Sequence, residues 1–343
     1  MNLSAPVLEV EGLSVDLTLA AGTLHAVSDV SFAVHAGETL CLVGESGCGK
    51  TMTSLALMRL LPREACLDAR ALRLEGRDLL KLGARGMNAL RGNRIALICQ
   101  DPMTSLNPVY TVGSQLEECY LRHRRAGRAE ARERAEELLA RVDVAAPRLR
   151  LSQYPHQLSG GLRQRMVIAM ALMCQPALLI ADEPTTALDV TVQAETLRLF
   201  ADLQREFNLA MLLISHDLGV VARIGHHVAV MYGGRIVERG PVAEVFGAPQ
   251  HPYTRGLLDC LPVSGMARRE DRLGAIPGRV PSLIGRQEGC NFRNRCAEAM
   301  PHCVVGDILM HDIGGDRGYR CLLPPAAAGR QSRARSPHKG ALA

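Results

Sequence analysis

The chain has 343 residues, which is enough for one large domain, a smaller appendage and a sizeable buried core. Its net charge of +5 is mild, and aromatic residues make up only 3% with no Trp, so the composition does not favour nucleic-acid binding. The longest apolar run, 166–174, is about half of the roughly 18 residues needed to cross a bilayer, and the N-terminus lacks a basic segment leading into an apolar signal core. We therefore expect a cytosolic protein that reaches a membrane only through partners.

The first 40 residues predict an antiparallel sheet. Residues 7–40 alternate apolar and polar positions, with turns at Ala21-Gly22 and Ala36-Gly37. The apolar run 39–43 reads as a buried strand, and 52–61 as the helix that follows it.

The strand and the helix are joined by a phosphate-binding template, Gly-x4-Gly-Lys-Ser/Thr, with every fixed position matched. Glycines let backbone N–H groups surround an anion, and the following helix adds the positive end of its dipole. Lys50 is expected to reach the β- and γ-phosphates, and the Thr51 hydroxyl to ligate Mg²⁺. The predicted nucleotide-binding run is Gly44, Glu45, Ser46, Gly47, Cys48, Gly49, Lys50, Thr51 and Met52.

Downstream, helices alternate with apolar strands. We expect a charged helix over 116–142 and a second helix over 158–173. A buried strand at 177–181 is followed by a helix at 192–207 and by strands at 210–214 and 228–232. In the first of these helices, Arg and Glu are interleaved at a spacing that favours a solvated, ion-paired face over a nucleic-acid patch. The alternation predicts a mainly parallel, doubly wound α/β sheet.

Two carboxylates end the strand 177–181. Asp182 is placed to hold Mg²⁺, and Glu183 to accept a proton from, or orient, the water that attacks the γ-phosphate. An acid pair that caps the next helix is the alternative, and it leaves the phosphate loop without a metal ligand.

The run Leu158-Ser159-Gly160-Gly161 offers a hydroxyl and glycine N–H groups at a helix start, which is a second anion site. It resembles the signature motif of ATP-binding cassette (ABC) ATPases. Further motifs follow the order of that family: Gln100 resembles its glutamine loop, Ala187-Leu188-Asp189 the loop after the acidic pair, and Ser215-His216-Asp217 its histidine switch. The five motifs cover residues 37–217.

The resemblance implies a P-loop core with an antiparallel β subdomain and a helical signature subdomain, acting as an ATPase in a head-to-tail dimer. Each ATP would lie between one protomer's phosphate loop and the signature residues Ser159, Gly160 and Gly161 of the other. His216 would contact the γ-phosphate, and Asp189 would link the two sites. Thr51, Gln100 and Asp182 would be the Mg²⁺ site. Gln100 would also sense the attacking water and would lie beside the surface that a membrane subunit engages. Glu183, His216 and Gln100 are thus the predicted catalytic residues.

One position departs from the family pattern. An aromatic residue near the end of the first strand usually stacks on adenine, and Leu17 stands there in this chain. Base–aromatic stacking contributes about 1–3 kcal/mol. We therefore expect weaker adenine affinity or selectivity, with binding dominated by the phosphate contacts.

Four stretches resemble the peptide and nickel importer ATPases of bacteria, so that the resemblance spans 7–323: they are 100–108, 181–190, 251–254 and 276–283. It implies import of di- or oligopeptides, with nickel and glutathione as alternative cargoes. The partners would be two transmembrane permease subunits, a second homologous ATPase subunit and an extracytoplasmic substrate-binding protein, and the chain would lie at the cytoplasmic face of the inner membrane. A soluble ABC ATPase acting on DNA or ribosomes is the alternative of another class.

Of eleven cysteines, seven are scattered through apolar positions of the first 260 residues and are expected to be small core residues. The other four are spaced Cys-x5-Cys-x6-Cys-x17-Cys. They could bind Zn²⁺ or an iron–sulfur cluster, or they could remain thiols that bind no metal. The absence of Cys-x2-Cys pairs disfavours a zinc ribbon, and some members of the importer branch carry a 4Fe–4S cluster here, so we favour a structural cluster on Cys290, Cys296, Cys303 and Cys321.

A shift to Pro-rich, non-periodic sequence near residue 248 divides the chain. We expect a nucleotide-binding domain at 1–248, a small Cys-containing extension at 249–323 and a disordered tail at 324–343.

Overall fold

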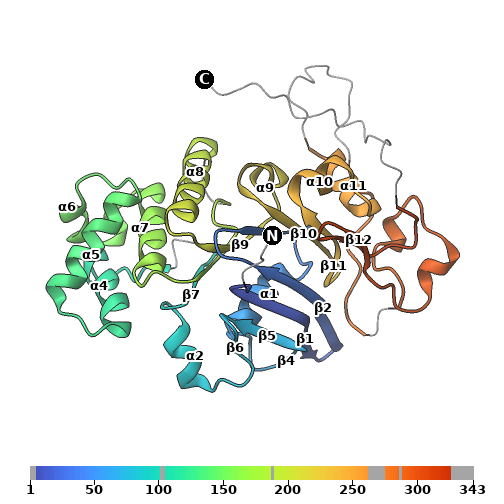
Figure 1. Cartoon of the computed structure of the whole chain (residues 1–343), viewed down its shortest axis with the longest axis horizontal. Helices are drawn as coiled ribbons and strands as arrows, with labels where there is room; N and C mark the ends of the chain where they lie inside the picture. The colour runs from blue at the N-terminus through green and yellow to red at the C-terminus, as the bar shows by residue number, and fades with distance from the viewer. Residues whose placement is uncertain (1–4, 101–104, 187–188, 262–274, 286–287, 326–343) are drawn as a thin grey trace, which may run out of the picture.

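The computed structural model describes residues 5–100, 105–186, 189–261, 275–285 and 288–325 (Figure 1). The first unit is an antiparallel sheet, as the alternating pattern predicted. Its strands are β1 (Leu8–Leu19), β2 (Gly22–Val34), β4 (Ala65–Asp68), β5 (Ala71–Leu74) and β6 (Arg77–Asp78). β1 pairs with β2, β4 and β5, and all of these pairings are antiparallel.

The second sheet forms the centre of the molecule. Its order is β12-β13-β11-β10-β3-β9-β8-β7. The five strands at one end are parallel, and apolar runs fill them: β3 (Thr39–Val43), β7 (Ile95–Ile98), β8 (Leu178–Asp182), β9 (Ala210–Ser215) and β10 (His227–Tyr232). Every residue of β3, β8 and β9 is buried, because helices or a second sheet cover both faces. The mainly parallel sheet is therefore confirmed.

Alternate residues of the same strands enter two separate cores. Leu40 and Leu42 of β3 join β1, β2 and the helix α1 (Lys50–Leu57) on one face. Cys41 and Val43 join the helices of the other face. This division follows from the two-residue period of a strand, and it places the antiparallel sheet and the helical layer on opposite sides.

Most of the helices connect successive strands along the chain. Their bounds are α2 (Ala84–Leu90), α4 (Val112–His123), α5 (Arg128–Arg141), α6 (Pro147–Leu151), α7 (Gly160–Leu172), α8 (Val190–Glu206), α9 (Leu218–Ile224), α10 (Val242–Gly247) and α11 (Pro252–Asp259), with short 3₁₀ turns at Pro155–Gln157, Arg293–Arg295 and Pro301–Val304. α4, α5, α6 and α7 form the helical lobe at the left of Figure 1.

The single helix expected over 116–142 is wrong in one respect. Two helices, α4 and α5, cover this stretch. The backbone is extended at Arg124, where α4 ends, and α5 begins only after Gly127. The expected ion pairs are present: Arg132 contacts Glu117 and Glu136, and Arg141 contacts Glu137. The helix therefore has the solvated, charge-paired face that its sequence predicted.

The Cys-containing extension adds to the central sheet. β11 (Arg235–Pro241) pairs with β13 (Arg317–Tyr319), and β13 pairs with β12 (His311–Gly314). A short segment of the extension also runs beside β2, where Leu24 bridges Ile284. The tail predicted at 324–343 lies almost wholly outside the described residues.

The scattered cysteines are only partly core residues. Cys41, Cys48 and Cys174 are buried as predicted, but Cys66 and Cys99 are exposed. For these two the prediction is wrong, because Cys66 lies on a strand whose residues are half-buried or exposed, and Cys99 follows the buried part of β7.

Candidate nucleotide site

The phosphate loop joins β3 to α1 through backbone conformations that only glycine adopts readily. Gly44 has φ of 156°, and a Cβ there would lie 2.1 Å from the carbonyl oxygen of Met231. Gly49 has φ of 106°, and a Cβ would lie 2.4 Å from the Ala26 oxygen. The two glycines therefore let the loop lie directly against neighbouring strands.

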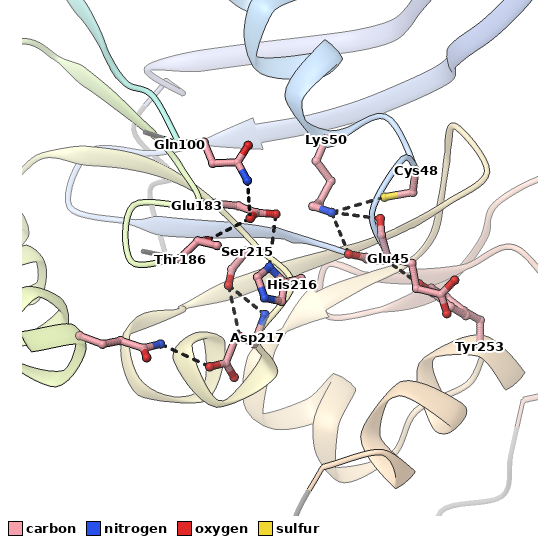
Figure 2. A network of polar contacts seen from close by, with 12 residues as sticks. Glu45, Cys48, Lys50, Gln100, Glu183, Thr186, Ser215, His216, Asp217 and Tyr253 are labelled. Carbon is pink, nitrogen blue, oxygen red and sulfur yellow. Dashed lines mark hydrogen bonds and ion pairs between the residues drawn. The ribbon is translucent and has the colours of Figure 1, made fainter. Parts of the chain in front are cut away.

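Lys50 folds back over the loop that precedes it. Its Nζ donates to the carbonyl oxygens of Gly44 (2.8 Å) and Glu45 (3.1 Å), and the residue is 5% exposed (Figure 2). The ammonium group is thus held at the mouth of the loop, where a bound phosphate would meet it.

A cavity of about 500 Å³ opens on the loop. It brings together residues that the sequence analysis took from four separate motifs, and Figure 2 shows Lys50, Gln100, Glu183 and His216 converging. The lining residues are Leu24, Ala26, Ser46, Gly47, Gly49, Lys50, Thr51, Met52, Gln100, Glu183, His216 and Leu283. Such a volume, lined by both polar and apolar residues, suits a nucleotide.

Asp182 has the features of a cation ligand. Its Oδ2 accepts a hydrogen bond from Ser54 (3.4 Å), whereas its buried Oδ1 has no partner among the described residues. Burial raises the pKa of Asp182, and a hydrogen bond from Thr51 opposes the rise. A buried carboxylate oxygen without a donor, beside a threonine hydroxyl, fits a hard cation such as Mg²⁺.

Glu183 is the centre of a polar cluster. Its Oε2 accepts from Gln100 Nε2 (3.1 Å) and from Thr186 Oγ1 (3.0 Å), and its Oε1 lies 3.3 Å from His216 Nδ1 (Figure 2). Its backbone has φ of +47°, a left-handed conformation that is uncommon for a side chain of this size. The fold thus holds this carboxylate at the edge of the cavity, where it could orient a water molecule.

The signature residues lie elsewhere. Ser159 is exposed and caps α7 by accepting a hydrogen bond from the Leu162 N–H (3.4 Å). Asp189 caps α8, accepting from Thr191 (3.1 Å) and Val192 (3.0 Å). Neither they nor the glycines after Ser159 line the cavity of their own chain. This separation is what a site shared between two chains requires, and the shared site itself stays a prediction. Of the loop before Asp189, Ala187 and Leu188 lie outside the described residues, as do 101–104 after Gln100.

Sequence analysis gave no role to Gln164, which follows the signature glycines. Its Nε2 donates to the carbonyl oxygen of Pro184 (2.8 Å), and the residue is fully buried. This bond ties α7 to the loop that follows Glu183, so the signature helix and the carboxylate are positioned together. The only sequence signal was the place of Gln164 three residues after the signature glycines.

Leu17 does not line the cavity. It pairs with Leu24 across the β1–β2 hairpin and packs against the core under the antiparallel sheet. Leu24, its partner, lines the cavity instead.

Two residues of the Cys-containing extension form hydrogen bonds with the phosphate loop. Arg295 Nη1 and Nη2 donate to the two carboxylate oxygens of Glu45, at 2.6 and 3.1 Å, and the Arg295 side chain is 6% exposed. The Tyr253 hydroxyl accepts from the Glu45 N–H at 2.9 Å. Sequence analysis placed Glu45 at the nucleotide but gave no signal for its partners, which lie more than 200 residues away.

Arg295→Met should lower the free energy of unfolding by about 1.5–3 kcal/mol, because it removes charge-assisted hydrogen bonds from a largely buried group. Chemical denaturation measures this change. Arg73→Met is the matched control: Arg73 also pairs with a glutamate, Glu9, at 2.9 Å, but the contact is exposed and the substitution should change stability little. Equal effects of the two substitutions would contradict the structural role of Arg295.

The four late cysteines lie around one small cavity of about 10 Å³, as their clustering in the sequence predicted. The Cys290 N–H donates to the Cys303 carbonyl oxygen at 2.8 Å, and burial raises the pKa of the Cys290 thiol to about 11. Within the described residues, no three Cys, His, Asp or Glu side chains are close enough to hold one metal ion as they stand. The thiols are gathered without being in ligating positions.

In the described part of the chain, none of the helices combines the length and the apolar character that crossing a membrane requires.

Comparisons with known proteins agree with this geometry. Residues 27–186 match the ABC transporter family, and residues 237–303 match the family described as the oligopeptide/dipeptide transporter C-terminal region. A dimeric structure of a bacterial ABC transporter cassette has a TM-score of 0.60 and 25% identity, and covers 68% of this chain and 98% of that one. The cassette fold is therefore shared.

Relatives match over nearly the full length. A putative peptide import ATP-binding protein of Brucella abortus is 49% identical over 92% of this chain and 97% of its own. The dipeptide transport ATP-binding protein DppD of Bacillus subtilis is 48% identical over 87% of this chain and 88% of its own. Together with the cassette fold and the assembled nucleotide cavity, these matches place the chain in the family of ABC transporter ATP-binding proteins that carry the oligopeptide/dipeptide transporter C-terminal region.

Proposed function

We propose that this chain is one of two ATPase subunits that drive the import of di- or oligopeptides. A peptide substrate is supported by the match of 237–303 to the oligopeptide/dipeptide transporter C-terminal region. Relatives named for peptide import support it as well. Two transmembrane permease subunits, a second homologous ATPase and an extracytoplasmic binding protein complete the system. The chain then lies at the cytoplasmic face of the inner membrane, attached through its partners.

The roles of the site residues form part of the proposal. Residues 44–52 cradle the triphosphate, with Lys50 on its β- and γ-phosphates. Thr51, Asp182 and Gln100 hold Mg²⁺, which neutralises phosphate charge when bound. Glu183 orients the attacking water, and His216 contacts the γ-phosphate. The contacts of Glu183 with Gln100 and His216 support this division of roles.

The signature residues act on the partner's nucleotide. Ser159, Gly160 and Gly161 complete the second subunit's site, and Asp189 links the two sites across the interface. The exposure of Ser159 and its distance from its own cavity lining support this arrangement. The dimeric cassette structures among the relatives offer a template for it.

Purification of the membrane complex followed by reconstitution in liposomes tests the proposal. With the binding protein present, ATP should drive uptake of a radiolabelled dipeptide or oligopeptide. Uptake of nickel or of glutathione instead would change the assigned substrate, and the assignment as an importer ATPase would stand. Co-purification with nucleic acid or ribosomes, without two integral membrane proteins, would refute the importer assignment in favour of the soluble ABC class.

The extension, 249–323, carries a metal centre on Cys290, Cys296, Cys303 and Cys321, which we favour as 4Fe–4S over Zn²⁺. Four thiols around one cavity are a suitable ligand set for either, once their side chains turn toward a common point. Such a centre would cross-link 290–321, a segment whose described regular structure consists of two 3₁₀ turns and two short strands.

Anaerobically purified protein should therefore contain about four iron atoms per chain and absorb in the visible range. Cys303→Ala should lose both the iron and the colour, whereas Cys66→Ala, at an exposed thiol far from the cluster in sequence, should keep them. Iron assay and absorbance measure this. Colourless protein with one zinc per chain would replace the iron–sulfur assignment, and metal-free thiols would refute both.

A further inference from the structure

The nucleotide cavity has one wall that comes from the C-terminal extension. Leu283 lines it together with Leu24 and Ala26 of β2 and the phosphate-loop residues. Leu283 is only 6% exposed, so its side chain is packed rather than free in solvent. None of the five cassette motifs includes this residue.

The segment that carries Leu283 is fixed at both ends. The His25 N–H donates to the Leu283 carbonyl oxygen at 3.0 Å, and the Gly285 N–H donates to the Thr23 oxygen at 2.9 Å, so the segment is held beside β2 by an isolated antiparallel bridge. At its other end, Arg295 donates to the carbonyl oxygens of Ile276 (3.1 Å) and Pro277 (2.8 Å). The same guanidinium holds Glu45 of the phosphate loop.

The cavity has both polar and aliphatic lining residues. Its polar lining side chains belong to the phosphate loop, the start of α1 and the three motifs around Glu183, where the phosphates and Mg²⁺ belong. Apart from Met52, next to Thr51, its aliphatic side chains are Leu24, Ala26 and Leu283. With a triphosphate seated on the loop, these three residues are the aliphatic part of the lining that remains to contact the base.

We propose that Leu283 contributes to the purine site beside Leu24, so that the extension contacts the nucleotide base in place of the aromatic residue missing at position 17. An aliphatic wall contacts the face of a purine and offers no hydrogen bond to its edge, so it discriminates little between adenine and guanine. The inference rests on the proposed placement of the phosphates on the loop.

The test is calorimetric binding of ATP, GTP and inorganic tripolyphosphate, each with Mg²⁺, to chains that carry Glu183→Gln to prevent hydrolysis. Leu283→Ala should weaken ATP and GTP by the same factor, about tenfold or 1.4 kcal/mol, because it removes apolar contact with the base. Tripolyphosphate, which has no base, should bind unchanged. Leu283→Met, which keeps the volume, should restore nucleotide affinity.

Ile284→Ala is the matched control, since the neighbouring side chain lies on the same segment but does not line the cavity. It should leave all three affinities unchanged. Unaltered ATP affinity in Leu283→Ala would overturn the inference. Equal weakening of ATP and tripolyphosphate would also overturn it, because Leu283 would then act on the loop and not on the base.

The placement of the phosphates is checked separately. Lys50→Ala should abolish tripolyphosphate binding, whatever residue stands at 283. If it did not, the proposed phosphate site would fail, and Leu283 would not be the cause.

Discussion

Glu183→Gln should keep ATP binding and reduce ATP turnover in the assembled complex by about 10²–10⁴-fold, the usual effect of a positioned general base. The amide keeps the size of the side chain but loses the carboxylate that could take up a proton. Its neighbours make the prediction specific: Gln100 and Thr186 donate to one carboxylate oxygen, and His216 lies beside the other. Phosphate release and equilibrium ATP binding are measured on the same preparation.

Glu9→Gln is a suitable control for this variant. Glu9 contacts Arg73 on the antiparallel sheet and does not line the cavity, so its substitution should leave turnover unchanged. Near-normal hydrolysis by Glu183→Gln in the complex would refute the assignment of Glu183. Loss of ATP binding would point to a structural role for Glu183, consistent with its left-handed backbone.

Ser159→Arg should leave ATP affinity for this chain's own phosphate loop unchanged and lower turnover of the complex by about 10²-fold or more, the range for removing one donor to a reacting group. Ser159 is exposed at the start of α7 and is absent from its own cavity. A long, charged side chain there would obstruct a tight contact with the partner's triphosphate. Nucleotide binding and phosphate release separate the two effects.

Ser152→Arg is the matched control for the signature variant. Ser152 is an exposed serine of the same helical lobe, bonded to the Leu149 carbonyl oxygen at 2.7 Å, and lies at the end of α6. The same change there should leave turnover as it was. Normal turnover in Ser159→Arg would argue against the shared site in this half of the dimer, and the corresponding substitution in the partner ATPase would test the other half.

The extension and the phosphate loop are joined by hydrogen bonds. Arg295 lies next to Cys296, and its guanidinium reaches the carboxylate of Glu45. The carbonyl of Glu45 in turn accepts from Lys50. The cysteine segment and Lys50 are thus joined through two successive contacts, Arg295 with Glu45 and Glu45 with Lys50.

Much of the core could be predicted because its signals are local. The phosphate loop needs glycines at particular backbone angles, and the buried strands β3, β8 and β9 need continuous apolar runs, so both leave direct marks in the sequence. The long charged helix was harder. The residues of 124–127 interrupt it without a proline, and a break of this kind depends on how α4 and α5 pack against each other.

By itself, the sequence determined the cassette and the order of its motifs, because both depend on residue types at fixed spacing. It also predicted the phosphate, acidic and signature residues from the same spacing. Only the tertiary structure decided that Arg295 and Tyr253 hold Glu45, that Gln164 anchors the loop after Glu183, and that Leu283 reaches the nucleotide cavity. These contacts join segments up to 250 residues apart, and they arise from how β2, the loop and the extension pack, which no local pattern records.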